Sequence, residues 1–395
     1  MQNAVSYLSL YNFRSYSSLS LSITPDPVVF VGANGAGKTN LLEALSLLAP
    51  GRGLRGVKSD EIALNGSPTA PTNPLRWAAA VTLLNDVHLS TGLELTPHGT
   101  EKRLYKIQHE PVKSQAAIAE WLTVFWLTPE TDRLFLESPS VRRKFIDRLV
   151  YANDPLHATR LTRYDHALKE RLQVLRQGGD PIWLTSLEEN LANYGVAIAA
   201  ARLELMKKLN RGQDHLHPLF PRFVSSINGD VENWLLADYA VTVESQIKEK
   251  LHQNRMIDRE SGMTRLGPHR SDWNLVHLKN NRSANQCSTG EQKILILAAL
   301  LSFLHDHSKN GDTQNREKLT VLLLDDVVAH LDFHHRMVLF EQIGILQNNR
   351  KEDTHEDPRG SSVHTWLTGT DPLLFEHLTG HAQFFNVHQS TVTLS

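Results

Sequence analysis

The sequence has a single cysteine, no excess of charge of either sign and no long apolar run. Cys287, the one cysteine among 395 residues, can form neither an intrachain disulfide nor a cysteine-rich zinc site. Lysine and arginine total 41 and aspartate and glutamate 43, so the formal net charge is −2 and any nucleic-acid contact needs a local basic patch. No apolar run approaches the roughly 18 residues of a membrane span, and a secretory signal's charged head is missing before Arg14. We therefore expect a soluble, cytoplasmic protein without a membrane partner.

Length and apolar periodicity indicate more than one domain. At about 150 residues per domain, the chain length suggests two or three domains. Short apolar runs between turns predict strands before residue 130, and a strand and helix alternation returns after residue 265. The predicted strands are Tyr7–Leu10, Val28–Gly32, Trp77–Leu84, Leu104–Ile107, Leu319–Leu324 and Val363–Thr368, and a helix is predicted over Ile294–Leu304.

The middle of the chain has a helical pattern instead. Apolar residues recur at intervals of three and four over Leu161–Leu175 and again over Trp183–Leu209. The break at Gly178–Pro181 predicts an antiparallel hairpin, with arms of roughly 20 to 28 residues and so about 30 to 40 Å long.

These patterns predict one α/β domain that is split by a mostly helical insertion. Residues 1–130 and 263–395 are the two parts of the α/β domain, and residues 131–262 are the insertion. The polar stretches His305–Lys318 and Asn348–Ser362 are predicted loops.

A glycine-rich loop follows the predicted strand at Val28–Val31 and precedes a helical apolar pattern over Asn40–Leu48. It has the pattern G-x-x-x-x-G-K-[ST], whose glycines let backbone N–H groups surround phosphate oxygens at a helix N-terminus. Lys38 is expected to reach the β- and γ-phosphates of a nucleotide, and Thr39 to coordinate magnesium. The residues of this predicted phosphate-binding loop are Gly32, Ala33, Asn34, Gly35, Ala36, Gly37, Lys38 and Thr39.

Two carboxylates follow the apolar strand predicted at Val321–Leu324. A buried strand delivers its terminal acid to a fixed point, and in phosphoryl transfer such an acid holds Mg²⁺ directly or through water. Asp325 is the predicted magnesium ligand, and Asp326 is placed to orient the attacking water. An ordinary strand that ends in a turn can have the same apolar run followed by two acids. The assignment of Asp325 and Asp326 therefore depends on the presence of the phosphate-binding loop in the same chain. Lys38, Asp325 and Asp326 are the predicted catalytic residues.

The hexapeptide Ser288–Lys293 precedes a predicted helix. Ser288 and Glu291 have the Ser-x-x-Glu spacing of a capping box, which satisfies free N–H groups at the helix start. Gly290 leaves donors and the positive end of the helix dipole able to meet an anion, such as the γ-phosphate of a nucleotide held by a second subunit. We expect both roles, with Ser288, Gly290 and Gln292 as nucleotide contacts.

With these three motifs in this order, the chain resembles ABC-type ATPases of the SMC-like branch, and more narrowly the RecF family of bacterial recombination proteins. The narrower resemblance covers most of the chain. Segments similar to family motifs are Leu10–Tyr16, Gly35–Ala44, Leu127–Glu130, Pro139, Arg142–Phe145, Asp147, Gly267–Arg270, Asp325–Asp326 and His330–Asp332. The resemblance adds Arg14 and Thr368 to the predicted nucleotide contacts, with Thr368 bonding the γ-phosphate or the attacking water at the place of a transporter's switch histidine.

Two positions depart from the expected pattern. His330 stands in the D-loop where an acid is expected, and Asp326 stands where most ABC ATPases have glutamate. Because aspartate is one methylene shorter, the base lies farther from the water and slow turnover is expected.

The resemblance implies an ATP-dependent homodimer that holds ATP and Mg²⁺ between its subunits. Each ATP would contact Gly32–Thr39 of one chain and Ser288–Lys293 of the other, and hydrolysis would open the dimer and release DNA. RecF-like proteins bind single- and double-stranded DNA at gap junctions and work with RecR and RecO to load RecA in DNA repair, replication and the SOS response. A weak, DNA-stimulated ATPase is implied here.

Two local basic runs are candidates for DNA contact. They are Arg52, Arg55 and Lys58, and Arg142, Arg143, Lys144 and Arg148. Such runs are more often solvated surfaces or ion-pair partners, so both interpretations stay open. Among the 20 histidines, His269 is the one that merits a test.

Other functions are compatible with part of the sequence. An SMC-type cohesion protein needs far longer arms than the roughly 40 Å of the predicted hairpin. If the chain were a transporter ATPase, we would expect a switch histidine where Thr368 stands. If it were a small-molecule kinase, Ser288–Lys293 would be only a helix cap, and the chain would not need ATP to dimerise. A nucleotide-gated DNA clamp with incidental hydrolysis shares every motif and stays open.

Overall fold

The structure is a computed structural model of the chain, and it describes residues 3–64, 74–310, 318–348 and 363–395. The chain forms two compact units. The first comprises Met1–Asp132, His215–Phe220 and Leu304–Ser395, and the second comprises Arg133–Asp214 and Pro221–Phe303. The predicted domain boundaries at 130 and 263 stay a prediction. The second compact unit continues to Phe303 and so includes the hexapeptide at 288–293.

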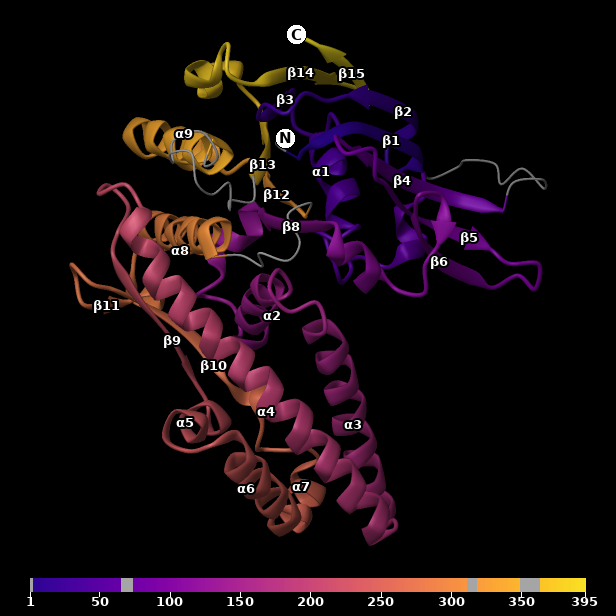
Figure 1. Cartoon of the computed structure of the whole chain (residues 1–395), viewed down its shortest axis with the longest axis vertical. Coiled ribbons are helices and arrows are strands. Elements are labelled where there is room, and N and C mark those ends of the chain that lie inside the picture. Colours follow the sequence, from indigo (N-terminus) through magenta and orange to yellow (C-terminus); the bar gives the residue numbers. More distant parts are fainter. Residues whose placement is uncertain (1–2, 65–73, 311–317, 349–362) are drawn as a thin grey trace. The chain divides into compact units, whose positions relative to one another are not determined.

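A mostly parallel sheet lies at the centre of the first unit (Figure 1). Its strands are β3 (Val28–Val31), β8 (Leu122–Leu127), β12 (Leu319–Leu324), β13 (Val363–Gly369), β14 (Gln383–His388) and β15 (Thr391–Leu394). They are ordered β15–β14–β3–β13–β12–β8, and β15 is antiparallel to β14. β3 and β12 are buried along their whole length, as their unbroken apolar runs predict. The carboxyl ends of β3, β13 and β12 are adjacent, which is where open α/β sheets bind ligands.

An antiparallel sheet forms the other layer of the first unit. Its strands are β1 (Val5–Phe13), β2 (Tyr16–Ser22), β4 (Leu75–Leu83), β5 (His88–Leu95), β6 (Glu101–Ile107) and β7 (Glu110–Pro111). The order is β2–β1–β4–β5–β6–β7. Along β4, buried residues alternate with half-buried ones, so one face of the sheet packs on the core.

Helix α1 (Lys38–Ser46) links the two sheets through a shared core. Leu41, Leu42 and Leu45 of α1 belong to one hydrophobic cluster with Trp77 of the antiparallel sheet and Val321 of the parallel sheet. The helix that follows the phosphate-binding loop is therefore fixed by packing on both sides. The strands predicted in this unit are all present, with ends that differ by a few residues from the predicted ones.

The second unit contains the predicted helical hairpin. α3 (His157–Gln177) has 21 residues and α4 (Pro181–Gly212) has 32, and the two helices lie side by side (Figure 1). Gly178 ends α3 in the left-handed conformation, with φ 65°, and Asp180 caps α4 by accepting a hydrogen bond from Ile182 N–H at 2.8 Å. The hairpin prediction is therefore confirmed, and α4 is longer than expected.

The remaining elements of the second unit surround this hairpin. The helices are α2 (Pro139–Val150), α5 (Asp230–Ala237), α6 (Ala240–Gln253) and α7 (Arg255–Ser261), and the strands are β9 (Phe223–Asn228), β10 (Asp272–His277) and β11 (Arg282–Ser283). β10 is the central strand of this small antiparallel sheet. Fully buried Arg171 of α3 donates hydrogen bonds to Glu188 and Asp258, which ties α3 to α4 and α7.

One predicted loop is helical in part. α8 (Thr289–Asn310) continues through the polar residues that follow Leu304, so the loop predicted over His305–Lys318 is wrong for its first six residues. His305 is buried, and its Nε2 lies 2.8 Å from Gln342 Oε1 of α9 (Phe333–Asn348), a partner that is distant in the sequence. The rest of that stretch up to residue 317, and residues 349–362 of the second predicted loop, lie outside the described residues.

In the described ranges, none of the helices combines the length and the apolar character that crossing a membrane requires.

Candidate nucleotide-binding site

The phosphate-binding loop joins β3 to α1 at the carboxyl edge of the parallel sheet. Gly37 has φ 111°, a conformation that strains any residue with a side chain. An ideal Cβ on Gly32 would lie only 2.1 Å from the carbonyl oxygen of Val387, so the loop passes too close to β14 for a larger residue. Gly32 N–H donates to Gly369 O at 3.2 Å, and Tyr16 Oη donates to Gly37 O at 3.2 Å. Both ends of the loop are thereby fixed.

Lys38 holds its ammonium group inside this loop. Its Nζ donates hydrogen bonds to Gly32 O at 2.6 Å and to Ala33 O at 2.9 Å. Burial lowers the pKa of Lys38, while the charges of Asp326 and Asp325 act in the opposite direction. The loop therefore presents a cation and backbone donors together, the combination that binds phosphate oxygens.

The acid after β12 lies beside the start of α1. Thr39 Oγ1 donates to Asp325 Oδ1 at 2.9 Å, and Thr368 Oγ1 of β13 donates to the same oxygen at 2.8 Å. Burial raises the pKa of Asp325, and the hydrogen bonds from Thr368 and Thr39 oppose that rise. The two predicted metal ligands, far apart in the sequence, are thus in direct contact.

Asp326 has an unusual backbone conformation for the position predicted to orient water. Its φ is 54°, in the left-handed region, and its N–H donates to Thr368 Oγ1 at 2.9 Å. Among the described residues, nothing forms a hydrogen bond with its buried Oδ1. A buried carboxylate oxygen is unfavourable without a donor, so this atom is suited to receive a hydrogen bond from a molecule in the site.

Thr368 touches both acids. It is fully buried, and its hydroxyl donates to Asp325 while accepting from the Asp326 N–H. The family resemblance predicts Thr368 in the site, but the contact of its hydroxyl with both acids is visible only in the structure. Its expected bond to the γ-phosphate or to water stays a prediction.

These groups line a cavity of about 240 Å³ that also includes Arg55. Arg55 was a candidate for DNA contact, but its Nη1 donates to Asn40 Oδ1 at 2.7 Å and to Glu43 Oε2 at 2.8 Å. Arg14, predicted to contact nucleotide, donates through Nε to Glu43 Oε2 at 2.8 Å and is absent from the cavity lining. Glu43 of α1, fully buried, therefore joins two arginines beside the site, a role that sequence reasoning missed.

The capping box predicted at the hexapeptide is confirmed. Ser288 N–H donates to Glu291 Oε2 at 2.8 Å, and Glu291 N–H donates to Ser288 Oγ at 3.4 Å. Ser288 and Gly290 are exposed, as an anion contact would require, and nothing lies within 4 Å of an ideal Cβ on Gly290. Gln292 differs, because it is buried and its Nε2 donates to Cys287 O at 2.9 Å. All these residues belong to the second unit.

The second basic run is largely used for internal bonds. Arg142 is buried and forms a two-pronged ion pair with Asp272, at 2.7 and 2.8 Å. Arg143 donates to Ser271 O at 2.6 Å, and the Arg148 guanidinium lies 5.1 Å from the centre of the Phe145 ring. Arg142 is therefore not free to contact DNA, whereas Arg143 and Arg148 are half-exposed and their contact with DNA stays a prediction. Lys144, which lies between them, is exposed, as are Arg52 and Lys58 of the first run.

Two histidines singled out in the sequence differ in their surroundings. His269 lies between Tyr164 Oη, 2.8 Å from its Nδ1, and Thr264 O, 2.9 Å from its Nε2, and burial lowers its pKa to about 4. It is therefore part of the interior of the second unit. His330 is exposed and ends the short 3₁₀ segment Val328–His330.

The mostly parallel sheet, the glycine loop at its carboxyl edge and the paired acids after β12 define a P-loop ATPase of the ABC type. A family model described as "AAA domain, putative AbiEii toxin, Type IV TA system" matches residues 28–355. The chain is 38% identical to the DNA replication and repair protein RecF of Mesorhizobium japonicum over 395 residues, which covers 99% of this chain and 98% of that protein. It belongs to the RecF family of DNA replication and repair proteins.

Further comparisons agree with this assignment. The RecF protein of Caulobacter vibrioides is 36% identical over 395 residues, covering 98% of this chain and 97% of that protein. The solved structure of the recombination mediator protein RecF-ATPrS in the RecFOR pathway has a TM-score of 0.79 and 21% identity, over 100% of this chain and 98% of that one. A solved SmcHead structure has a TM-score of 0.52 and 13% identity, over 99% of this chain and 96% of that chain. The two structures show that the fold is shared.

Proposed function

We propose that the chain is an ATP-dependent DNA-binding protein of recombinational repair and replication restart. It dimerises on ATP and Mg²⁺ at gapped DNA in the cytoplasm, and with RecR and RecO it helps to load RecA onto single-stranded DNA. The observation that carries this proposal is the convergence of Lys38, Thr39, Asp325 and Asp326 on one cavity. Relatives named as DNA replication and repair proteins, and a solved relative described as RecF-ATP in the RecFOR pathway, support the biological role.

The residues of the cavity fit a magnesium nucleotide. Backbone N–H groups of the glycine loop and Lys38 Nζ would hold the phosphates, and Thr39 Oγ1 and the Asp325 carboxylate would hold Mg²⁺, which prefers such oxygen ligands. When bound, Mg-ATP supplies the phosphoanhydride bond and a divalent charge. The unpartnered Oδ1 of Asp326 is available to accept a proton from an attacking water, and the hydrogen bond from the Asp326 N–H to Thr368 Oγ1 fixes the backbone that carries it.

The exposed helix start at Ser288 and Gly290 supports ATP-dependent dimerisation. The cavity in the first unit is lined by Lys38, by the proposed metal ligands and by the proposed base, whereas Ser288 and Gly290 belong to the other unit. In the proposed dimer, the helix start of one chain meets the γ-phosphate bound by its partner. Association then depends on ATP, and loss of the γ-phosphate separates the chains.

Sedimentation velocity with and without Mg-ATP tests this proposal. The test variants are Lys38→Ala and Ser288→Arg, and the control is Ser245→Arg on the exposed face of α6. We expect ATP to convert the wild type and Ser245→Arg to dimers, and Lys38→Ala and Ser288→Arg to stay monomeric. Gapped duplex DNA should strengthen the dimers. A wild type that binds Mg-ATP tightly but stays monomeric contradicts the proposal, and a dimer retained by Ser288→Arg reduces the hexapeptide to a helix cap.

A further inference from the structure

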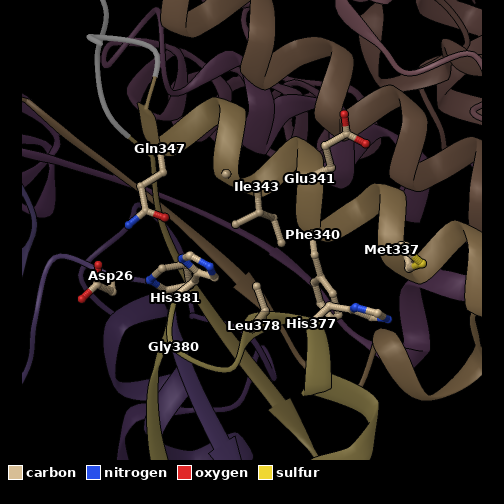
Figure 2. Close-up of a pocket in the computed structure, with 12 residues that line it drawn as sticks. Asp26, Met337, Phe340, Glu341, Ile343, Gln347, His377, Leu378, Gly380 and His381 are labelled. Atoms are coloured by element: carbon tan, nitrogen blue, oxygen red, sulfur yellow. The ribbon is translucent and has the colours of Figure 1, made fainter.

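A second cavity lies in the first unit, along helix α9. Its volume is about 460 Å³, within the range of ligand-binding sites. One wall is formed by Met337, Phe340, Gly344 and Gln347, which recur every three or four residues and so lie on one face of the helix. Figure 2 shows this face opposite the segment 377–381, with Asp26 at one end. We call this cavity the α9 groove.

The floor of the α9 groove is apolar and its middle is open. Phe340, Ile343 and Leu378 are buried, with 6%, 0% and 5% exposure, while Met337 at the rim is 40% exposed. No atom lies within 4 Å of an ideal Cβ on Gly344. The helix therefore leaves empty space above an apolar floor, as a side chain from another molecule would need.

The rim of the groove is acidic. Asp26 and Glu341 are exposed at its edge, and none of the described residues that line it is a lysine or an arginine. The other polar groups there are the imidazoles of His377 and His381 and the amide of Gln347, whose Nε2 donates to Pro25 O at 2.7 Å. The charge of the groove therefore favours a cationic occupant.

We propose that the α9 groove binds a short segment of a partner protein in which apolar side chains stand beside lysine or arginine. Met337 and Gln347 are ten residues apart on one helix, so the groove is about 15 Å long and matches an extended segment of about five residues. The apolar side chains pack on Phe340 and Leu378, and the cations pair with Glu341 and Asp26. All these residues are separate from the nucleotide cavity, so the inference does not depend on the proposed ATP-driven dimer.

Methionine-methyl NMR provides the test. The chain has 5 methionines, and among them Met337 lines the groove while Met256 and Met263 are exposed on the second unit. The probe is a synthetic octapeptide of leucine, arginine and serine, and the control peptide has glutamate in place of arginine. We expect the arginine peptide to shift the Met337 methyl signal saturably and to leave Met256 and Met263 unchanged. No shift, or an equal shift with the glutamate peptide, overturns the proposal.

Two variants locate the binding. Gly344→Leu fills the open space and replaces glycine inside a helix, so we expect it to fold and to abolish the Met337 shift. Glu341→Lys should weaken the arginine peptide about threefold to tenfold, whereas Glu189→Lys on the exposed surface of α4 should not. Undiminished binding in Glu341→Lys overturns the proposal even where Gly344→Leu fails to fold.

Discussion

At the scale of single residues, the site is organised around one hydroxyl group. Thr368 Oγ1 is bonded to the side chain of Asp325 and to the backbone of Asp326, the predicted metal ligand and the predicted base. Because Thr368 is fully buried, water cannot replace either bond when the hydroxyl is removed. We therefore infer that Thr368 is a positioning residue, which holds the two predicted functional acids whether or not it contacts the nucleotide itself.

Replacing Thr368 tests this role. Thr368→Val keeps the shape but removes both hydrogen bonds, so we expect kcat for ATP hydrolysis to fall by roughly 10- to 100-fold, with a smaller change in KM. Thr368→Ser keeps the hydroxyl and should retain most of the activity. Steady-state ATPase assays with and without DNA measure both effects. If Thr368→Val and Thr368→Ser reduce kcat equally, the hydrogen bonds of the hydroxyl group do not explain the effect of Thr368 on hydrolysis.

At the scale of elements, the segment Gly267–Arg270 connects the helices of the second unit to β10. His269 within it bonds Tyr164 of α3, and the Pro268 carbonyl accepts a hydrogen bond at 2.6 Å from Arg202 of α4. Arg202 in turn forms a buried two-pronged pair with Asp147 of α2. The segment is therefore bonded directly to two helices, and to a third through Arg202, so its buried histidine has a structural role.

This segment should make the second unit sensitive to acid. In the folded chain His269 has a pKa of about 4, whereas an unfolded chain binds a proton there near pH 6.5. As the pH falls from about 6.5 towards 4, the unfolded state gains a proton that the folded state does not, so the free energy of unfolding decreases by up to about 3 kcal/mol. Urea unfolding followed by circular dichroism at several pH values measures this loss.

The matched variants are His269→Gln and His166→Gln. We expect His269→Gln to lose less stability than the wild type over that pH range, because it has no proton to gain. His166, largely exposed on α3, should leave the pH dependence unchanged when it is replaced. An identical acid dependence in the wild type and His269→Gln would show that other groups are responsible.

At the scale of the whole molecule, a formal net charge of −2 means that any contact with DNA needs a local basic patch. Arg142 is buried in an ion pair with Asp272 and is not free for DNA, whereas half-exposed Arg143 and Arg148 also contact groups of the second unit. Arg52 and Lys58 of the first unit and Lys144 of the second are exposed and stay candidates, and only the first run has two such residues close together. Phosphate contacts of this kind carry no base information, so we expect little sequence preference.

Salt dependence tests the DNA contact directly. Affinity for gapped duplex DNA in the presence of Mg-ATP should fall at least about tenfold between roughly 50 and 200 mM salt, measured by fluorescence anisotropy. Arg52→Glu with Lys58→Glu should weaken binding and reduce the salt slope, whereas Lys279→Glu, exposed in the second unit, serves as the control. Equal affinity at both salt concentrations argues against phosphate contacts altogether.

Elements that depend on local patterns can be predicted from the amino-acid sequence. The strand and glycine loop around Gly32–Thr39, the buried strand before Asp325 and the hairpin about Gly178–Pro181 all follow from periodicity and turn chemistry over a few residues. The capping box at Ser288 is equally local. Such features involve residues that are close in the chain, so composition and spacing are enough to predict them.

The burial of polar residues and the choice of their partners depend on tertiary contacts, which local patterns do not reveal. His305 continues a helix because Gln342 is its partner, Arg142 is withdrawn from the surface by Asp272, and Arg55 turns to Glu43 beside the nucleotide cavity. In the same way, the hydroxyl of Thr368 joins both acids. A charged or polar side chain is stable in the interior only when a partner satisfies it, and folding brings these partners from distant parts of the chain.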